Sequence, residues 1–186
     1  MISPLKATAM PTVQSRAEKI RLVVLDVDGV LTDGAINISS NGELYKRFNV
    51  RDGLGIKMLQ KAGIEIAIIT GRTSDIVAER AKELAITRVA QGQRFKTKAF
   101  EVLLQETGLT DEEVAYMGDD VPDLPLIMRV GLATTPADGN PMLLNYTHWQ
   151  SSFNGGHGAV RELSELILKS QGVWDKLIHE TYVLGQ

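Results

Sequence analysis

Residues 21–34 read RLVVLDVDGVLTDG, and this stretch decides the fold. Its first part, Arg21–Val27, is a nearly continuous apolar run, which is typical of a strand buried on both faces of a sheet. Two carboxylates separated by one residue, Asp26 and Asp28, end the run, and Gly29 then allows the backbone to turn tightly. The stretch therefore predicts a buried strand that leads into a polar loop.

Similar apolar runs recur along the chain, separated by segments with helical periodicity. Gly63–Thr70 and Glu113–Gly118 are typical of buried strands, and Thr87–Ala90 and Val130–Thr134 are shorter candidates. Two of the intervening segments show helical spacing. Ile76, Val77, Ala81 and Leu84 gather on one helical face, and Phe100, Leu103, Leu104 and Thr107 fall at i, i+3, i+4 and i+7. Strands that alternate with helices predict a doubly wound, Rossmann-like α/β domain, with a parallel sheet covered by helices on both faces.

One insertion interrupts this alternation after the first strand. Ala35–Ser39 (AINIS) and Glu43–Val50 (ELYKRFNV) flank Asn41-Gly42, which is a strong signal for a hairpin turn. A two-stranded hairpin is only marginally stable alone in water. We therefore expect the hairpin at residues 35–50 to pack on another surface, such as a second subunit.

Composition excludes several classes of protein. The chain has 186 residues, 44% of them hydrophobic, and its net charge of −3 provides no basic face for nucleic acid or a membrane surface. It has no cysteine and three widely separated histidines, which excludes disulfides, thiolate chemistry and Cys-based zinc sites. The sequence shows neither a signal peptide nor an apolar run long enough to span a bilayer. We expect a soluble cytoplasmic protein with no nucleic-acid or membrane partner, whose chemistry depends on carboxylates, hydroxyls and amines.

The chain divides into three expected parts. Residues 1–19 form a flexible segment or a short helix, residues 20–171 form the single α/β domain, and residues 172–186 form a C-terminal tail.

A second acidic cluster follows another predicted strand. Asp119, Asp120 and Asp123 come after Glu113–Gly118, and parallel sheets bind ligands at the carboxyl ends of their strands. If both strands lie near the sheet centre, five carboxylates converge and repel one another unless a cation lies between them. Oxygen ligands without histidine or cysteine indicate Mg²⁺. The alternative interpretation is a solvated turn in which Asp120 or Asp123 caps the segment from Pro122.

Four segments together resemble the motifs of the haloacid dehalogenase-like phosphatases. In chain order they are Asp26-Val-Asp28-Gly29-Val-Leu-Thr32, Ile-Ile-Thr70-Gly71-Arg72, Lys96, and Gly118-Asp119-Asp120-x-x-Asp123. Further segments are similar to one family within this superfamily, the 3-deoxy-D-manno-octulosonate 8-phosphate phosphatases. These are the hairpin, Asn49-Val-Arg51-Asp52-Gly53, Gln91-Gly92-Gln93, and the stretch from Gly155-Gly156-His157-Gly158 to Arg161-Glu162. The likeness extends from about Arg21 to Gln171.

The resemblance implies both a reaction and a set of roles. The reaction is Mg²⁺-dependent hydrolysis of the eight-carbon sugar acid phosphate through an aspartyl-phosphate intermediate, in lipopolysaccharide biosynthesis. Asp26 is implied as the nucleophile, and Asp28 as the general acid and base. Mg²⁺ is expected on Asp26, on the backbone carbonyl of Asp28 and on Asp119. Thr70 is expected to hold the phosphoryl oxygens, and Lys96 to neutralise part of their charge.

Other residues are expected around this centre. Asp123 is expected to orient Lys96 or a metal-bound water, and Asp120 lies beside it. The expected substrate-binding residues are Gly29, Thr32, Gly71, Arg72, Arg51 and Arg161. Each assignment has a structural alternative: Lys96 is a solvated surface charge, Thr70 ends a strand and Thr32 is structural.

The segments between Asp28 and Thr70 and between Lys96 and Asp119 are too short for a separate cap domain. The resemblance implies a homotetramer in which hairpins assemble and the glycine-rich segment of a neighbouring subunit reaches the active site. Gly155–Gly158 are then a mobile lid, whereas the simpler interpretation is a flexible connector before a helix.

Three other functions remain open at this point. They are a phosphatase for a nine-carbon sugar acid phosphate, a non-catalytic assembly module of the same fold, and a phospho-acceptor regulatory domain. The last fits poorly, because the Asp26/Asp28 pair and the GDDVPD segment are not its usual pattern.

Overall fold

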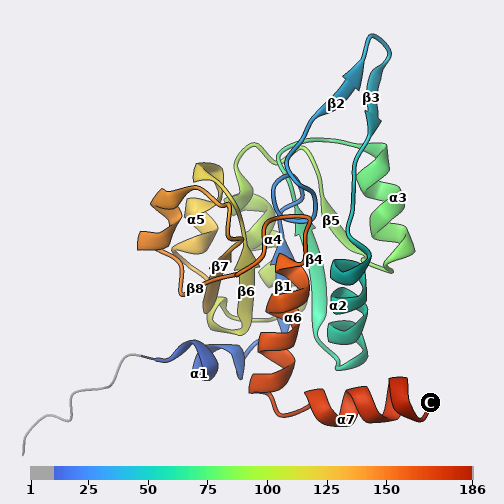
Figure 1. Cartoon of the computed structure of the whole chain (residues 1–186). Coiled ribbons are helices and arrows are strands. Elements are labelled where there is room, and N and C mark those ends of the chain that lie inside the picture. Colours follow the sequence, from blue (N-terminus) through green and yellow to red (C-terminus); the bar gives the residue numbers. More distant parts are fainter. Residues whose placement is uncertain (1–10, 186) are drawn as a thin grey trace, which may run out of the picture.

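The computed structural model describes residues 11–185, so most of the expected segment at residues 1–19, and Gln186, lie outside the described residues (Figure 1). Six strands form one parallel sheet in the order β5-β4-β1-β6-β7-β8. They are β1 (Leu22–Leu25), β4 (Glu65–Ile69), β5 (Arg88–Ala90), β6 (Val114–Met117), β7 (Leu132–Thr135) and β8 (Trp149–Gln150). The predicted doubly wound α/β fold is confirmed.

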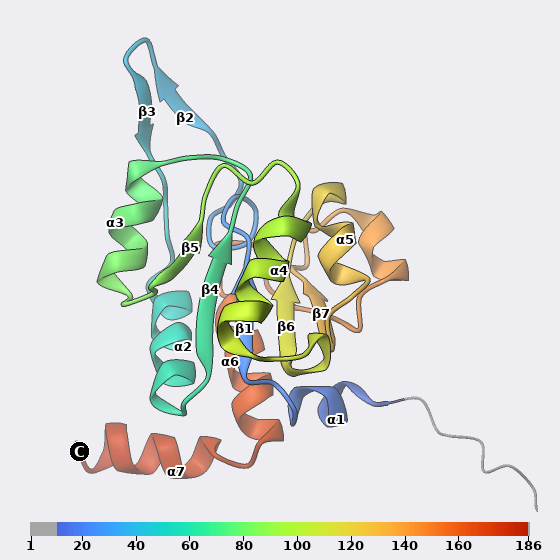
Figure 2. The same ribbon diagram turned by 180° about the vertical axis from the view of Figure 1, so that it is seen from behind.

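Helices cover both faces of this sheet (Figures 1 and 2). One face packs against α1 (Val13–Ala17), α2 (Val50–Lys61), α3 (Asp75–Glu83), α6 (Ala159–Ser170) and α7 (Trp174–Ile178). The other face, in front in Figure 2, packs against α4 (Lys96–Thr107) and α5 (Leu124–Ile127). Short turns complete the chain: η1 (Asp111–Glu113), η2 (Val121–Asp123), η3 (Pro141–Asn145) and the π-helical η4 (His179–Val183).

β1 lies inside the sheet, between β4 and β6, and all four of its side chains are fully buried. Its last residue, Leu25, pairs with Ile68 of β4 on one side and with Met117 of β6 on the other. Alternate side chains enter the two separate cores, Val23 and Leu25 on the α2/α6 face and Leu22 and Val24 on the α4/α5 face. A continuous apolar run is the pattern that burial on both faces requires.

The expected hairpin is present and rises from the edge of the sheet at which the strands end (Figure 1). Its strands are β2 (Asn37–Ser39) and β3 (Gly42–Tyr45), which pair antiparallel. The second strand is shorter than predicted and ends at Tyr45, and Asn49 then accepts a hydrogen bond from the Arg51 amide and caps α2. Val50 is therefore helical.

Strand order also determines where a ligand site forms. The chain leaves β1 for β4 on one side and later returns to β6 on the other, so the topological switch point lies between β1 and β6. Asp26 directly follows β1, and Asp119 is the second residue after β6. Within the described residues, the longest α-helices have 12 residues, and none is long and apolar enough to cross a bilayer.

Candidate active site

Three carboxylates converge at the switch point. Asp26, Asp119 and Asp123 each offer one oxygen, and these atoms lie within 4.8 Å of one another. Asp26 and Asp119 are partly buried, and Asp123 is almost completely buried. Of the five carboxylates expected to converge, the structure brings these three together, whereas the side chain of Asp28 faces Lys46 and Asp120 is exposed.

A buried ammonium group joins two of these carboxylates. Lys96 is the first residue of α4, and its side chain is 3% exposed, so the alternative of a solvated surface charge is wrong. Its Nζ lies 2.7 Å from Oδ2 of Asp26 and 2.6 Å from Oδ1 of Asp123. The hydroxyl of Tyr116 donates to the same oxygen of Asp123 at 2.6 Å, and Lys96 donates to that hydroxyl at 3.1 Å. Tyr116 lies on β6, which sequence reasoning identified only as a buried strand.

Asp123 also organises the loop that carries Asp119. Its second oxygen accepts hydrogen bonds from the backbone amides of Asp119 (2.9 Å) and Asp120 (3.2 Å). Gly118 is required here, because a Cβ at this position would lie 2.4 Å from Cγ of Asp123. Asp120 itself is exposed and accepts a hydrogen bond from Asn140 at 2.7 Å. Asp123 is thus surrounded by donors and is well placed to orient Lys96.

The three carboxylates repel one another, and the Lys96 ammonium alone does not balance their charge. Burial, reinforced by the charges of Asp123 and Asp26, raises the pKa of Asp119 to about 7. Burial also raises the pKa of Asp26, against the opposing effect of Lys96. For Lys96, burial alone lowers the pKa, but the carboxylates of Asp26 and Asp123 outweigh it and the pKa rises. The protonated ammonium group therefore neutralises only part of the charge.

The donor set fits Mg²⁺. Asp26 and Asp119 supply hard carboxylate oxygens, the ligands that this ion prefers in proteins. The loop after β1 approaches them closely, since Gly29 has a φ of +84° and a Cβ there would lie 2.1 Å from Oδ2 of Asp119. Any other residue at this position would push the loop away from Asp119.

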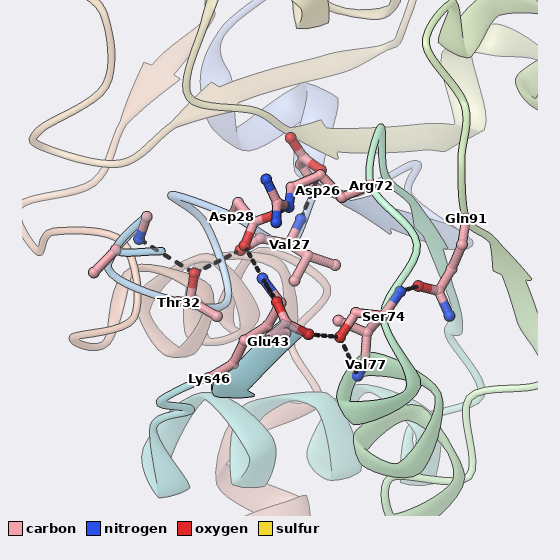
Figure 3. A network of polar contacts seen from close by, with 12 residues as sticks. Asp26, Val27, Asp28, Thr32, Glu43, Lys46, Arg72, Ser74, Val77 and Gln91 are labelled. Atoms are coloured by element: carbon pink, nitrogen blue, oxygen red, sulfur yellow. Dashed lines mark hydrogen bonds and ion pairs between the residues drawn. The ribbon is translucent and has the colours of Figure 1, made fainter. Parts of the chain in front are cut away.

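The side chain of Asp28 faces a different set of groups (Figure 3). One carboxylate oxygen contacts Nζ of Lys46, and the other lies 3.7 Å from Nε of Arg72. Lys46 comes from the connection between β3 and α2, and sequence reasoning missed it. Two-residue alternation places it on the same face as Leu44 and Phe48, but Leu44 is exposed, so the pattern gave no signal for the burial of Lys46.

The remaining residues near the strand ends hold the loops in place. Thr32 is buried, and its hydroxyl donates to the carbonyl of Val27 at 3.4 Å and accepts from the amide of Gly34 at 3.2 Å. Thr70 is buried at the end of β4, where its amide donates to the Ala90 carbonyl at 3.0 Å. Gly71 and Arg72 continue that loop toward Asp28.

Arg51 and Arg161 lie elsewhere in the single chain. Both line a cavity of about 640 Å³ together with Trp149 and Phe153, and this cavity includes none of the clustered carboxylates. Nε of Arg161 is 2.9 Å from Oε1 of Glu165. Substrate binding by these two arginines stays a prediction that a single subunit does not test.

The glycine-rich segment packs tightly on the loop that follows the Asp26 strand. The amide of Gly156 donates to the carbonyl of Val30 at 2.9 Å, and a Cβ on Gly155 would lie 1.8 Å from the carbonyl oxygen of Gly29. That this segment reaches the site of a neighbouring subunit stays a prediction, because the structure describes one subunit. Within this chain, its backbone is fixed against its own loop. The side chain of Asp52 secures it by accepting hydrogen bonds from the amides at the start of α6.

Comparison with known proteins identifies close relatives. No family model matches the chain. The 3-deoxy-D-manno-octulosonate 8-phosphate phosphatase of Salmonella typhimurium is 46% identical over 166 residues, which cover 89% of this chain and 88% of that protein.

Two solved structures extend this similarity to the fold. The 3-deoxy-D-manno-octulosonate 8-phosphate phosphatase of Yersinia pestis superposes with a TM-score of 0.86 at 45% identity, covering 88% of each chain. The enzyme of Moraxella catarrhalis, solved in complex with magnesium ion, phosphate ion and the sugar acid, gives 0.88 at 41% identity, covering 92% of this chain and 98% of that one. With this identity along nearly the whole length of its relatives, the chain belongs to the 3-deoxy-D-manno-octulosonate 8-phosphate phosphatase family of haloacid dehalogenase-like hydrolases.

Proposed function

We infer that this chain is a Mg²⁺-dependent phosphatase that converts 3-deoxy-D-manno-octulosonate 8-phosphate into the free sugar acid and phosphate. The observation that carries this function is the buried Lys96 ammonium between Asp26 and Asp123, beside Asp119, in a member of that enzyme family. A phosphate monoester is a dianion, so its site must combine a nucleophile with positive charge. Lys96 and a bound Mg²⁺ supply that charge.

In the first step, a carboxylate oxygen of Asp26 attacks phosphorus. The bond between phosphorus and the sugar oxygen breaks, and Asp28 donates a proton to the departing alkoxide. Asp26 is oriented for this attack, because Oδ1 accepts a hydrogen bond from the Val27 amide at 2.7 Å while Oδ2 contacts Lys96. Thr70 and the amides of its loop bind the phosphoryl oxygens.

In the second step, water attacks phosphorus and releases phosphate from Asp26, while Asp28 accepts the proton of that water. Mg²⁺, when bound, screens the charge of the phosphoryl group; Asp26, Asp119 and the backbone carbonyl of Asp28 would hold it. Asp123 keeps Lys96 directed at Asp26 through both steps.

The assembly proposed for the enzyme is a homotetramer built through its hairpins. Four apolar side chains on the hairpin are between 45% and 64% exposed: Ile36, Ile38, Leu44 and Tyr45. Such a concentration on a two-stranded insertion favours burial against other subunits. We place the enzyme in the cytoplasm, where it supplies the free sugar acid for lipopolysaccharide biosynthesis.

Phosphate release from a panel of sugar phosphates tests this function. We expect the eight-carbon acid phosphate to be the best substrate, activity to disappear with EDTA and to return with Mg²⁺, and Asp26→Asn to be inactive while keeping its circular dichroism spectrum. A nine-carbon substrate hydrolysed with a higher kcat/KM, or an active Asp26→Asn variant, would contradict the assignment. Light scattering of the same samples measures the oligomeric state.

A further inference from the structure

The hairpin insertion contains one buried residue, and it is a lysine. Between Asp33 and Val50, Lys46 alone is buried, and its side chain is 2% exposed. Removing an ammonium group from water costs several kcal/mol unless it is paired and hydrogen-bonded. A lysine in this position therefore depends on the groups that surround it.

Those groups include the proposed general acid. Nζ of Lys46 contacts Oδ1 of Asp28 and lies 3.1 Å from Oε1 of Glu43 (Figure 3). Arg72 is farther away, at 3.7 Å from the other oxygen of Asp28, and its side chain is half exposed. Lys46 is thus the closer and better shielded of the two cations that face this carboxylate.

Glu43 holds Lys46 in place and is itself held by residues outside the hairpin. Oε2 of Glu43 accepts a hydrogen bond from the hydroxyl of Ser74, the residue that caps α3. The backbone amide of Ser74 donates to Oε1 of Gln91 at 2.7 Å. The hydrogen bond from Ser74, with a further contribution from Lys46, lowers the pKa of Glu43 and keeps it anionic. Figure 3 shows these contacts as one line of groups that runs from Asp28 to the loop after β5.

We propose that Lys46 is a positioning residue that fixes the Asp28 carboxylate in the orientation required for proton transfer to the leaving oxygen. Glu43 and Ser74 fix Lys46 in turn. The hairpin then has a role within its own active site as well as in assembly. This inference rests on the proposed function, because it takes Asp28 to be the general acid and base.

If Lys46 has this role, its loss should slow the reaction by an amount that depends on the leaving group. A sugar alkoxide leaves only with a proton, and a general acid must be within about 2.6–3.2 Å of the oxygen that receives it. A displacement of about 1 Å costs on the order of 100-fold in rate. The 4-nitrophenolate anion needs little protonation, so its departure is insensitive to the position of Asp28. A purely structural role for Lys46 would slow both reactions equally.

The test compares Lys46→Met with wild type in single-turnover experiments on the sugar acid phosphate and on 4-nitrophenyl phosphate. We expect a loss of about 100-fold on the sugar phosphate. The burst of 4-nitrophenolate and the Mg²⁺ concentration at half-activation should stay close to wild type. Lys46→Arg, which restores a cation, should recover most of the lost rate. Lys57→Met, at an exposed lysine of α2, is the matched control and should behave as wild type.

Equal losses on the two substrates, or no loss on the sugar phosphate, would overturn the proposal. If Lys46→Met does not fold, Glu43→Gln provides the same comparison: it leaves the ammonium present but weakens its anchor, and a smaller loss confined to the sugar phosphate is expected. If the wild-type protein does not hydrolyse the eight-carbon substrate, the proposed function is wrong, whatever the result for Lys46. The comparison of alkyl with aryl phosphates still tests Lys46 on whichever alkyl phosphate wild type hydrolyses.

Discussion

The substitution Asp119→Asn should stabilise the metal-free protein and abolish its response to Mg²⁺. Asparagine has nearly the shape of aspartate but no charge, so it relieves the repulsion between Asp119, Asp26 and Asp123. The folded state raises the pKa of Asp119 from 3.8 to about 7, so it binds this proton more tightly than the unfolded chain does. Without metal, Asp119 therefore lowers the free energy of unfolding progressively as the pH rises from about 4 to about 7, and by a constant amount above that.

The size of the effect follows from the two pKa values. A rise from 3.8 to about 7 corresponds to about 4 kcal/mol. Asp119 is only partly buried, and solvent screening reduces this to about 1–2 kcal/mol. For a chain of this size, each kcal/mol moves the unfolding temperature by about 2–4 °C. In EDTA at pH 8, the variant should therefore unfold roughly 2–8 °C above wild type, and the gap should shrink at pH 5.

Thermal unfolding followed by circular dichroism measures this gap with and without Mg²⁺. Binding at 100 times the dissociation constant stabilises wild type by about 2.7 kcal/mol, whereas the variant lacks a charged ligand and gains less. The order of the two unfolding temperatures should therefore reverse on adding Mg²⁺. Asp175→Asn is the control, since Asp175 is exposed on α7 and is not among the charges that raise the pKa of Asp119. The reasoning is refuted if Asp119→Asn is the less stable protein in EDTA at pH 8, or if Mg²⁺ stabilises both proteins equally.

Three further substitutions test other parts of the site. Asp28→Asn should bind Mg²⁺ with nearly wild-type affinity in calorimetry but lose turnover, because the proposed mechanism assigns proton transfer to its side chain and metal binding to its backbone carbonyl. Weakened Mg²⁺ binding with normal turnover at saturating metal would contradict this division. Gly29→Ala should lower the unfolding temperature and the Mg²⁺ affinity together, since a positive φ costs about 1–2 kcal/mol and the new methyl group displaces Asp119. Tyr116→Phe removes a hydrogen bond to buried Asp123 and should lower the free energy of unfolding in urea by about 1.5–3 kcal/mol. A change below about 0.5 kcal/mol, which is typical of a surface substitution, would show that the carboxylate of Asp123 does not need this hydroxyl.

The parts of the fold that sequence reasoning predicted are those with a strong repeating pattern. β1, β4 and β6 are buried on both faces and therefore appear as continuous apolar runs. β8 has only two residues, too few to produce a pattern. The start of α2 was misplaced because alternation in residues 43–50 continued the predicted strand, whereas β3 ends at Tyr45 and the Asn49 cap that begins α2 is a single-residue signal.

The residues of the candidate site also fall into a group that the sequence predicts and a group that it does not. Asp26 and Asp119 could be brought together from sequence alone, because strand ends of a parallel sheet share one edge. Lys46 and Tyr116 could not, since a lysine in a hairpin usually faces solvent and a tyrosine in an apolar strand usually belongs to the core. Their roles depend on which groups face them across the fold, and that is a property of tertiary packing.

The contact between Gly156 and Val30 has a consequence for how the enzyme matures. The loop that follows Asp26 is made early in synthesis, but the backbone that covers it is made near the end. A ribosome-bound chain that stops before Gly155 can pair β1 with β4 and β6, yet its Val30 carbonyl lacks that partner. The backbone contacts of this loop are thus completed late in synthesis, and protection of the Gly156 amide from hydrogen exchange reports when they form.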